Sequence, residues 1–453
     1  MPAISPARTT AFAILMDIER GRDHSDNLLR GQEVSVLSPA DRNLATALAL
    51  GVLRWQIRLD YHIRPLLNRP NAKLDSEVLI ALRLGAFQIL FLDRIPAHAA
   101  IDESVELTKQ SGHRFASAMV NAVLRKLLNG STVRSNFSEE SPDALALAQA
   151  HPAWIVERWA GIYGIERARV ICSRGQMQPA LSVRLESPQV EDELAQAGVR
   201  LNPGDLLNAA RTAASGDLTA TEAFRAGRVR AQDEGSQLIG ELAAFIGEKA
   251  TRILDTCSAP GGKTLILAER NPQARIVACE SNLRRFAQLS KRLAAFAGQV
   301  ECRFADATTL SEESMFDLVM ADVPCSGTGT LGRNPEIRHR LRPDDLNRQA
   351  ERQCEILRGA VQAVRRGGCV VYSTCSLEPE ENEHVVAKVI SENQNSRQLS
   401  FEPHINSLLR KGILNSGGAD RLLKCLTPQG ALRLLPGSVP TDGFFVALIE
   451  KNL

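Results

Sequence analysis

The sequence predicts a multidomain protein with three parts: an all-helical N-terminal domain, a small α/β connecting subdomain and a doubly wound α/β C-terminal domain. Up to about residue 140, apolar residues recur at helical spacing and β-branched runs are few. From about residue 232, short apolar strands alternate with helices, which is typical of a mostly parallel sheet. A chain of 453 residues is long enough for two or three domains. We expect the domains to span 1–140, 145–230 and 232–453.

Local signals place several elements of the first two parts. Ser38-Pro39 predicts a helix start, with Asp41 in the first turn. Polar residues at 129–131 and 135–142 indicate a domain boundary. In the connecting region we expect a helix over 154–163 and an alternating strand over 180–185.

The C-terminal part has the most regular pattern. We expect strands at 252–254, 275–279, 300–304, 316–321 and 369–374, and helices at 264–269, 283–296 and 346–364, the last stopped by Gly367-Gly368. Ligands of such sheets bind beyond the carboxyl ends of the strands. The polar residues discussed below all lie at those ends, so we expect one site there.

A glycine loop follows the first of these strands. The loop is not a phosphate loop, because Cys257 stands where that pattern needs a glycine, and the G-x-G-x-x-G fingerprint is also absent. Glycines at a helix start still let a ligand approach the backbone. Glu280 can accept hydrogen bonds from ribose hydroxyls, and Asp306 can receive an adenine amino group. An adenosine cofactor without pyrophosphate fits, namely S-adenosylmethionine. The candidate cofactor residues are Cys257, Ser258, Ala259, Pro260, Gly261, Gly262, Lys263, Glu280, Asp306 and Asp322.

Two cysteines about fifty residues apart end apolar runs, in Asp322-Val323-Pro324-Cys325 and in Ser373-Thr374-Cys375. A free cysteine is often a small core residue, but the neighbouring Pro, Ser and Thr favour exposed loops here. Cytosine C5 is a poor nucleophile until a thiolate adds to C6, and the adduct must later be eliminated. Two thiols can divide this work, and Asp322 can hold N3 of the base. The chemistry alone leaves open which cysteine attacks.

Cysteine spacing and apolar runs indicate where the protein acts and which partners it lacks. Nine cysteines without a C-x-x-C pair argue against a zinc site and a disulfide framework, so we expect no metal and a reducing cytoplasm. The sequence shows no signal peptide and no apolar run near the roughly 18 residues that a membrane helix needs, so we expect no membrane partner.

Basic residues cluster in two places, although the formal net charge is only +2. One cluster is Arg54, Arg58, Arg64, Arg69 and Lys73, and between Arg333 and Arg366 nine arginines face five acids. Such runs are often solvated faces, but beside a site for a flipped base they favour phosphate contact. We expect Arg54, Arg58, Arg333 and Arg338 to contact RNA. Aromatic residues are only 4% of the chain, so shape and phosphate contacts should dominate.

The C-terminal part resembles the Nop/Sun family of RNA cytosine-5 methyltransferases. The resemblance rests on 255–263, 322–329, 372–376, Glu380-Glu381-Asn382-Glu383 and 441–445. The N-terminal part is similar to the NusB antitermination factor, through 41–42, 51–54, 81–85 and 120–125. The resemblance implies a Rossmann-like class I methyltransferase fold with an antiparallel closing strand, S-adenosylmethionine as cofactor and 16S ribosomal RNA as substrate.

The same resemblance assigns roles to residues. Cys375 would attack C6, Cys325 would assist product release, and Asp322 would contact the cytosine and the cofactor edge. One departure is visible: relatives often carry Trp shortly after the segment 334–338, whereas His339-Arg340 follow here, and we expect His339 to be a solvated loop residue.

Two other functions remain open at this point. The protein could methylate cytosine in tRNA, DNA or another nucleic acid with the same chemistry. It could also be a non-catalytic NusB-like RNA-binding assembly factor, although the intact Cys325, Cys375 and Asp322 argue against that. We expect a monomer.

Overall fold

The computed structural model describes residues 4–130 and 137–452. The chain divides into two compact units: unit 1 contains Met1–Gln178 and Leu331–Arg340, and unit 2 contains Pro179–Thr330 and Leu341–Leu453. This division differs from the three ranges expected from the sequence. The first helices of the connecting region, up to Gln178, belong to unit 1, whereas its strands and its two later helices, at Gln189–Gln196 and Glu222–Arg225, belong to unit 2. The predicted boundary at 129–142 lies partly outside the described residues.

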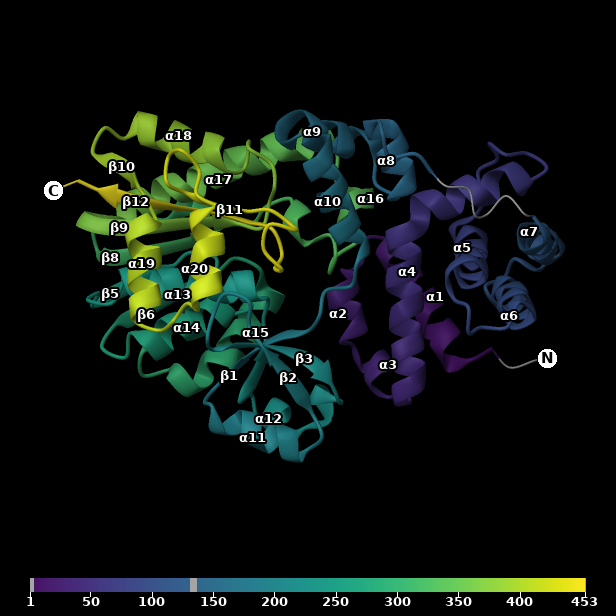
Figure 1. Ribbon diagram of the computed structural model, residues 1–453, viewed down its shortest axis with the longest axis horizontal. Helices are drawn as coiled ribbons and strands as arrows, with labels where there is room; N and C mark the ends of the chain where they lie inside the picture. Colours follow the sequence, from purple (N-terminus) through teal and green to yellow (C-terminus); the bar gives the residue numbers. More distant parts are fainter. Residues whose placement is uncertain (1–3, 131–136, 453) are drawn as a thin grey trace. The chain divides into compact units, whose positions relative to one another are not determined.

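Unit 1 is all-helical (Figure 1). Its α-helices are α1 (Pro6–Glu19), α2 (Ser25–Leu29), α3 (Gln32–Ser35), α4 (Pro39–Ile63), α5 (Ser76–Phe91), α6 (Ala97–Gln110), α7 (Ser117–Asn129), α8 (Pro142–Ala148), α9 (Ala153–Tyr163), α10 (Ile165–Gln176) and α16 (Ile337–Arg340). The start of α4 is confirmed: Asp41 N donates to Ser38 Oγ at 3.1 Å.

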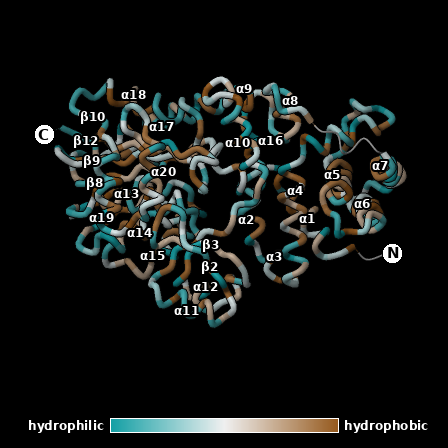
Figure 2. The backbone as a smooth tube through the Cα atoms, in the orientation of Figure 1, coloured by the Kyte–Doolittle hydropathy of each residue, from teal (hydrophilic) through white to brown (hydrophobic). Residues whose placement is uncertain are grey.

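The core of unit 1 forms where α4 and α5 pack closely. Hydrophobic residues follow both helices (Figure 2), and Leu48, Leu82 and Leu84 are fully buried. At Gly51 on α4, a Cβ would lie 2.0 Å from the ring of Phe87 on α5. A glycine is therefore required at this contact, because any side chain there would displace the ring.

The segment Leu331–Arg340 belongs to unit 1 although it lies between two parts of unit 2 in the sequence. Ser25 N and Oγ donate to the buried Glu336 carboxylate at 3.0 and 2.8 Å. Arg54 Nη2 donates to Gly332 O at 2.7 Å, and Arg338 Nη2 donates to Gly175 O at 2.9 Å. Buried polar contacts thus tie this segment to the N-terminal helices.

Unit 2 contains two sheets. The smaller one has the order β2-β3-β1-β4, with all pairs antiparallel. Its elements are β1 (Ser182–Leu185), α11 (Gln189–Gln196), β2 (Arg200–Pro203), β3 (Ala210–Ser215), α12 (Glu222–Arg225) and β4 (Val229–Ala231). The expected strand at 180–185 is therefore present, two residues shorter at its start.

The larger sheet has eight strands in the order β10-β12-β9-β8-β5-β6-β7, with β11 paired to β12. Strands β5 to β9 pair in parallel, and β10, β11 and β12 pair antiparallel. The elements are α13 (Glu234–Ile246), β5 (Arg252–Asp255), α14 (Gly262–Arg270), β6 (Arg275–Glu280), α15 (Leu283–Leu293), β7 (Val300–Phe304), β8 (Phe316–Asp322), α17 (Pro343–Ala363), β9 (Val364–Thr374), α18 (Glu383–Glu392), β10 (Ser396–Leu399), α19 (Glu402–Arg410), α20 (Ser416–Leu423), β11 (Leu432–Leu434) and β12 (Phe444–Lys451). The predicted fold class, including the antiparallel closing strand, is confirmed.

Alternate residues of β5 pack in different hydrophobic clusters, each of which includes helices. The helices of this unit are labelled around the large sheet in Figure 1. On β5, Ile253 packs in the cluster that contains α13 and α14, whereas Leu254 packs in the cluster that contains α17 and α18. A strand buried on both faces reads as a continuous apolar run, which is why the pattern identified these strands.

One boundary was predicted wrongly. The long helix α17 ends at Ala363, and β9 begins at once and runs through Gly367 and Gly368. Gly367 adopts φ +69°, and the pairing of β8 with β9 shifts register between Phe316 and Leu318. The glycines therefore permit an irregular strand start instead of ending the helix.

Among the described residues no helix is long and apolar enough to cross a membrane. All nine cysteines are free thiols. Within 4–130 and 137–452, no three His, Cys, Asp or Glu side chains gather as metal ligands would.

Candidate active site

The glycine loop connects β5 to α14 at the carboxyl edge of the large sheet. Gly261 caps α14 with φ +96°, a conformation that favours glycine. Asp255, at the end of β5, is buried and accepts a hydrogen bond from Thr264 Oγ1 at 2.7 Å. Burial raises the pKa of Asp255 to about 7. Its Oδ1 atom is buried and has no hydrogen-bond partner among the described residues, so a ligand that carries a donor would satisfy it.

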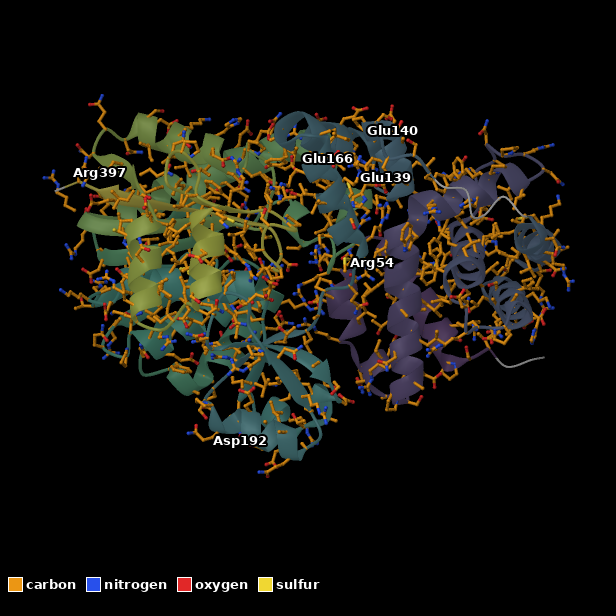
Figure 3. All side chains as sticks on the ribbon, viewed as in Figure 1. Arg54, Glu139, Glu140, Glu166, Asp192 and Arg397 are labelled. Atoms are coloured by element: carbon orange, nitrogen blue, oxygen red, sulfur yellow. The ribbon has the colours of Figure 1, made fainter. Side chains whose placement is uncertain are left out.

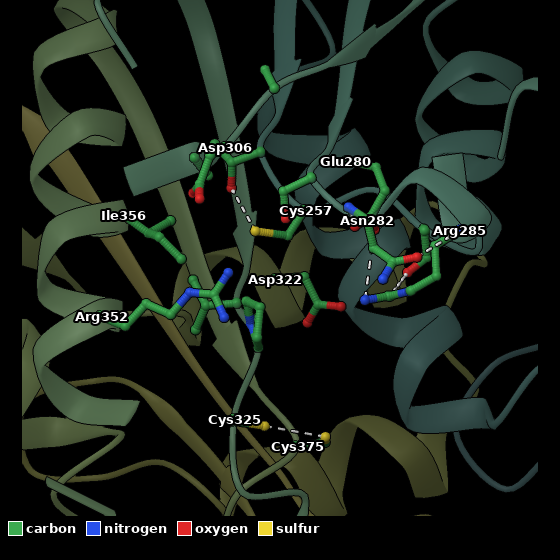
Figure 4. Close-up of a pocket in the computed structure, with 17 residues that line it drawn as sticks. Cys257, Glu280, Asn282, Arg285, Asp306, Asp322, Cys325, Arg352, Ile356 and Cys375 are labelled. Carbon is green, nitrogen blue, oxygen red and sulfur yellow. Dashed lines mark hydrogen bonds and ion pairs between the residues drawn. The ribbon is translucent and has the colours of Figure 1, made fainter. Parts of the chain in front are cut away.

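A cavity of about 520 Å³ opens beside this loop (Figure 4). This volume lies in the usual range for small-molecule sites. Five of the predicted cofactor residues line it: Cys257, Ala259, Glu280, Asp306 and Asp322. Four others, Ser258, Pro260, Gly262 and Lys263, line a smaller adjoining cavity that shares Cys257, Ala259 and Asp322. The structure therefore brings the predicted cofactor residues together at one edge of the sheet.

Two carboxylates, those of Glu280 and Asp306, line the cavity. Glu280 ends β6, is buried, and accepts from Asn282 N at 2.8 Å. Asp306 follows β7 and accepts from Thr308 N at 2.9 Å, which lowers its pKa and keeps it ionised. Both carboxylates retain lone pairs that could accept from ligand hydroxyl or amino groups. A cavity lined by these hydrogen-bond acceptors fits an adenosine cofactor, which carries hydroxyl and amino donors.

The two predicted cysteines meet in the lining of the same cavity (Figure 4). Cys325 Sγ and Cys375 Sγ lie 3.3 Å apart. They meet because β8 and β9 are parallel neighbours in which Asp322 pairs with Ser373. The loops that follow these two strands must therefore leave the sheet side by side.

Asp322 lies beside the thiols and is held by two donors. Lys263 Nζ approaches Asp322 Oδ2 at 2.6 Å, and Ser373 Oγ donates to Oδ1 at 2.7 Å. Burial alone would lower the pKa of Lys263, but the Asp322 carboxylate raises it overall, and Cys375 acts in the same direction. Lys263 therefore stays an ammonium paired with the Asp322 carboxylate.

The surroundings of the two thiols differ. The hydrogen bond to Cys375 raises the pKa of Cys325 well above its usual value, and burial and the Glu381 carboxylate act in the same direction. Cys325 is thus held as a neutral thiol. Cys375, for its part, raises the pKa of Lys263.

Comparisons with known proteins identify the family of the chain. A family model described as NusB family matches residues 5–129, and one described as 16S rRNA methyltransferase RsmB/F matches residues 244–450. A protein of Bacillus subtilis (strain 168), named probable ribosomal RNA small subunit methyltransferase B, is 32% identical over 98% of this chain and 98% of its own. The ribosomal RNA small subunit methyltransferase B of Escherichia coli (strain K12) is 30% identical over 98% of this chain and 97% of its own.

This chain belongs to the ribosomal RNA small subunit methyltransferase B family. S-adenosylmethionine is accordingly its cofactor. Solved structures share the fold: PH0851 superposes with a TM-score of 0.79 at 24% identity over 99% of both chains. The structure of NSun6 from Pyrococcus horikoshii with SFG gives 0.53 at 17% identity, over 65% of this chain and 97% of that one.

The methyltransferase B cavity also contains residues that the sequence did not single out. Asn282 and Arg285 enter it from the start of α15, and Arg352 and Ile356 from α17. Arg285 Nη2 donates to Ala259 O at 2.7 Å, which braces the glycine loop. Arg352 lies within the arginine-rich stretch noted in the sequence, and that excess of arginine was the available signal.

Two predicted RNA contacts are wrong in this member of the family. Arg54 (labelled in Figure 3) is 6% exposed and Arg338 is 1% exposed, and both donate to backbone carbonyls inside unit 1. Burial lowers the pKa of Arg54 to about 10 and that of Arg338 to about 9. Neither guanidinium lies on the surface, where a phosphate could reach it.

The predictions for Arg58, His339 and Arg333 have different outcomes. Arg58 is half-buried, with its guanidinium carbon 4.3 Å from the centre of the Phe137 ring. His339 is not a solvated loop residue, because its Nε2 bonds to Leu53 O at 2.7 Å and burial lowers its pKa to about 4. Arg333 is partly exposed, and its contact with RNA stays a prediction.

Proposed function

We propose that this methyltransferase transfers a methyl group to C5 of a cytosine in 16S ribosomal RNA through a covalent bond between Cys375 and C6. The observation that carries the proposal is the pair of thiols 3.3 Å apart in the lining of the cofactor cavity. A single nucleophile would suffice for most transfers, whereas a bond to C6 must be both made and broken.

The residues around the cavity supply the steps. Cys375 adds to C6 as the thiolate, next to the Lys263 ammonium, whose pKa is raised in part by Cys375. The Asp322 carboxylate, fixed by Lys263 and Ser373, accepts hydrogen bonds from the N4 amino group and from N3 once N3 is protonated. The added electron pair makes C5 nucleophilic. S-adenosylmethionine, held by the glycine loop, Glu280 and Asp306, supplies the electrophilic methyl group there.

The second thiol, that of Cys325, acts in product release. After methylation, solvent water takes the proton from C5, the C5–H electron pair forms the C5–C6 double bond, and the bond between Cys375 Sγ and C6 breaks with its electrons on the sulfur. Cys325, held as a neutral thiol 3.3 Å away, donates a proton to the departing sulfur. A donor at this distance stabilises the thiolate as it leaves, so the adduct does not persist.

The choice of RNA rests on relatives. The methyltransferase B proteins of Bacillus subtilis and Escherichia coli are named for small-subunit ribosomal RNA, and each is similar over nearly its whole length. The helical unit carries the NusB-family match, which supports RNA binding by that unit. A monomeric, cytoplasmic protein remains our prediction.

The test is methylation of defined RNAs by the purified protein. We expect 5-methylcytosine in protein-free 16S ribosomal RNA, detected by bisulfite sequencing, and none with the Cys375→Ala variant. Methylation of a tRNA pool but not of 16S ribosomal RNA would overturn the substrate. Methylation at another atom of the base would overturn the reaction.

A further inference from the structure

A buried carboxylate connects the two loops that carry the thiols. Glu381 is 0% exposed and lies just before α18. Its Oε1 atom accepts from Ser326 N at 2.8 Å, in the residue directly after Cys325. Its Oε2 atom accepts from the hydroxyls of Ser326 and Ser376, the residues that directly follow the two cysteines. One side chain therefore bonds to both cysteine loops.

Other buried groups fix Glu381 itself. Gln353 Nε2 on α17 donates to Glu381 Oε1 at 3.0 Å and to Pro324 O at 2.8 Å. Tyr372 on β9 donates to Glu381 O at 2.6 Å. Asn382 Nδ2 donates to Ser376 O at 3.0 Å. A network satisfied at this many atoms resists small displacements, because each shift leaves a buried polar group unpaired.

We propose that Glu381 is a positioning residue that holds the Cys325 loop and the Cys375 loop together, so that both thiols reach one base. The inference rests on the proposed two-cysteine function, and adds to it the group that sets the spacing of the thiols. Glu381 does not line the cavity, so it acts through the loops and not on the substrate. The Glu381 negative charge also favours the neutral form of the Cys325 thiol, in line with its role in release.

Two substitutions can distinguish a loss of thiol positioning from a loss of folding. Glu381→Ala removes both acceptors, while the backbone bond from Gly329 N to Cys375 O, at 2.9 Å, still connects the loops. Glu383→Ala is the matched control, because Glu383 is a neighbouring carboxylate that accepts from Arg433 instead. Binding of S-adenosylhomocysteine, measured by calorimetry, reports whether each variant keeps the cofactor cavity intact.

The first readout is the distance between the thiols, and it needs neither RNA nor catalysis. Diamide oxidises two neighbouring thiols to a disulfide and takes up their two electrons and two protons. Mass spectrometry of the joined Cys325 and Cys375 peptides gives the rate. Because misplacement by about 1 Å can change a proximity-driven rate about 100-fold, we expect Glu381→Ala to slow joining at least tenfold. Glu383→Ala should join at the wild-type rate.

The second readout compares the effects of the substitution on kcat and on KM for methylation of RNA. Glu381→Ala should lower kcat by about tenfold or more, with KM and the affinity for S-adenosylhomocysteine each within about threefold of wild type. Wild-type joining and wild-type kcat in Glu381→Ala would overturn the proposal. If the wild-type protein methylates no cytosine but Glu381→Ala still slows joining, the proposed function fails and the positioning role stands.

A second variant covers the case in which Glu381→Ala does not bind S-adenosylhomocysteine. Replacing Ser326 and Ser376 together by Ala removes the two hydroxyl donors and leaves the carboxylate bonded to Ser326 N and Gln353. The loss of these two hydrogen bonds loosens the contact between the loops, so joining should be about threefold slower or more. Joining at the wild-type rate in this variant would overturn the proposal.

Discussion

Lys263 Nζ lies 2.6 Å from Asp322 Oδ2, although the two residues are 59 positions apart in the chain. The contact joins the glycine loop to the end of β8, and so joins the cofactor cavity to the thiols. A buried ammonium is stable only beside a negative charge, which makes Asp322 the partner that Lys263 requires.

Asp322→Asn tests this pair. The amide keeps the shape of the side chain but removes the charge, so the pKa of Lys263 should fall and the base should lose its acceptor. By analogy with loss of one preorganised electrostatic contact, kcat should fall about 100-fold or more. Steady-state methylation of 16S ribosomal RNA measures it. Ser373→Ala is the control, because it removes only one neutral donor to the same carboxylate and should lower kcat less than tenfold.

Arg338 makes a prediction about stability rather than RNA binding. Its guanidinium is 1% exposed and donates to the carbonyls of Arg54 in α4, Gly175 in α10, Ala150 after α8 and Leu331. Arg338→Ala would strand these oxygens and leave a cavity, at about 3–5 kcal/mol. Hydrogen exchange of the amides in Leu331–Arg340 measures the loss. The exposed Arg94, changed to Ala in the same unit, should leave exchange unchanged, and equal exchange in both variants would contradict the account.

His339 predicts acid sensitivity of the same unit. Its pKa is about 4 in the folded protein and 6.5 in the unfolded chain. Between these values the unfolded state binds the proton and the folded state does not. The free energy of unfolding should therefore fall as pH drops from about 6.5 to 4, by roughly 3 kcal/mol for this group. Buried His151 shifts in the same direction.

The measurement is the pH dependence of urea unfolding for His339→Asn. The Asn amide does not titrate, so the loss of stability on acidification should be smaller than in wild type. His98, an exposed histidine of unit 1, serves as the control when changed to Asn. Identical pH profiles for wild type and His339→Asn would show that His339 does not carry the effect.

RNA contact is now expected from the exposed basic residues of the first cluster. Arg69 and Lys73 are exposed, unlike Arg54. Replacing both by Ala should weaken RNA binding and reduce the slope of log affinity against log salt by about 1.4, at about 0.7 for each lost contact to a single strand. Filter binding at several salt concentrations measures the slope. An unchanged slope would remove these two residues from the RNA surface.

The sequence predicted the large sheet and its site because both follow from local patterns. Strands buried on both faces read as apolar runs, and Glu280, Asp306, Asp322 and Cys375 stand at their ends. Parallel pairing then places those ends at one edge, as Asp322 opposite Ser373 shows. The cysteine pair could therefore be expected to meet, although its 3.3 Å spacing could not.

The burial of arginines by residues distant in the sequence could not be predicted from the number of charges in a segment. Arg338 and Arg54 look like surface residues in a basic stretch, yet the partners that bury them are 284 and 278 positions away in the chain. Glu381 was visible only as one acid in Glu380-Glu381-Asn382-Glu383. Its partners Ser326 and Gln353 come from a loop and a helix that only the fold brings together.

The central claim is that Cys375 attacks the base and Cys325 releases it, and adduct trapping tests it most directly. The two single Ala variants are incubated with 16S ribosomal RNA and S-adenosylmethionine, then separated under denaturing conditions. We predict that Cys325→Ala accumulates a denaturant-stable protein–RNA adduct and that Cys375→Ala forms none. An adduct with Cys375→Ala and none with Cys325→Ala would contradict the assigned roles.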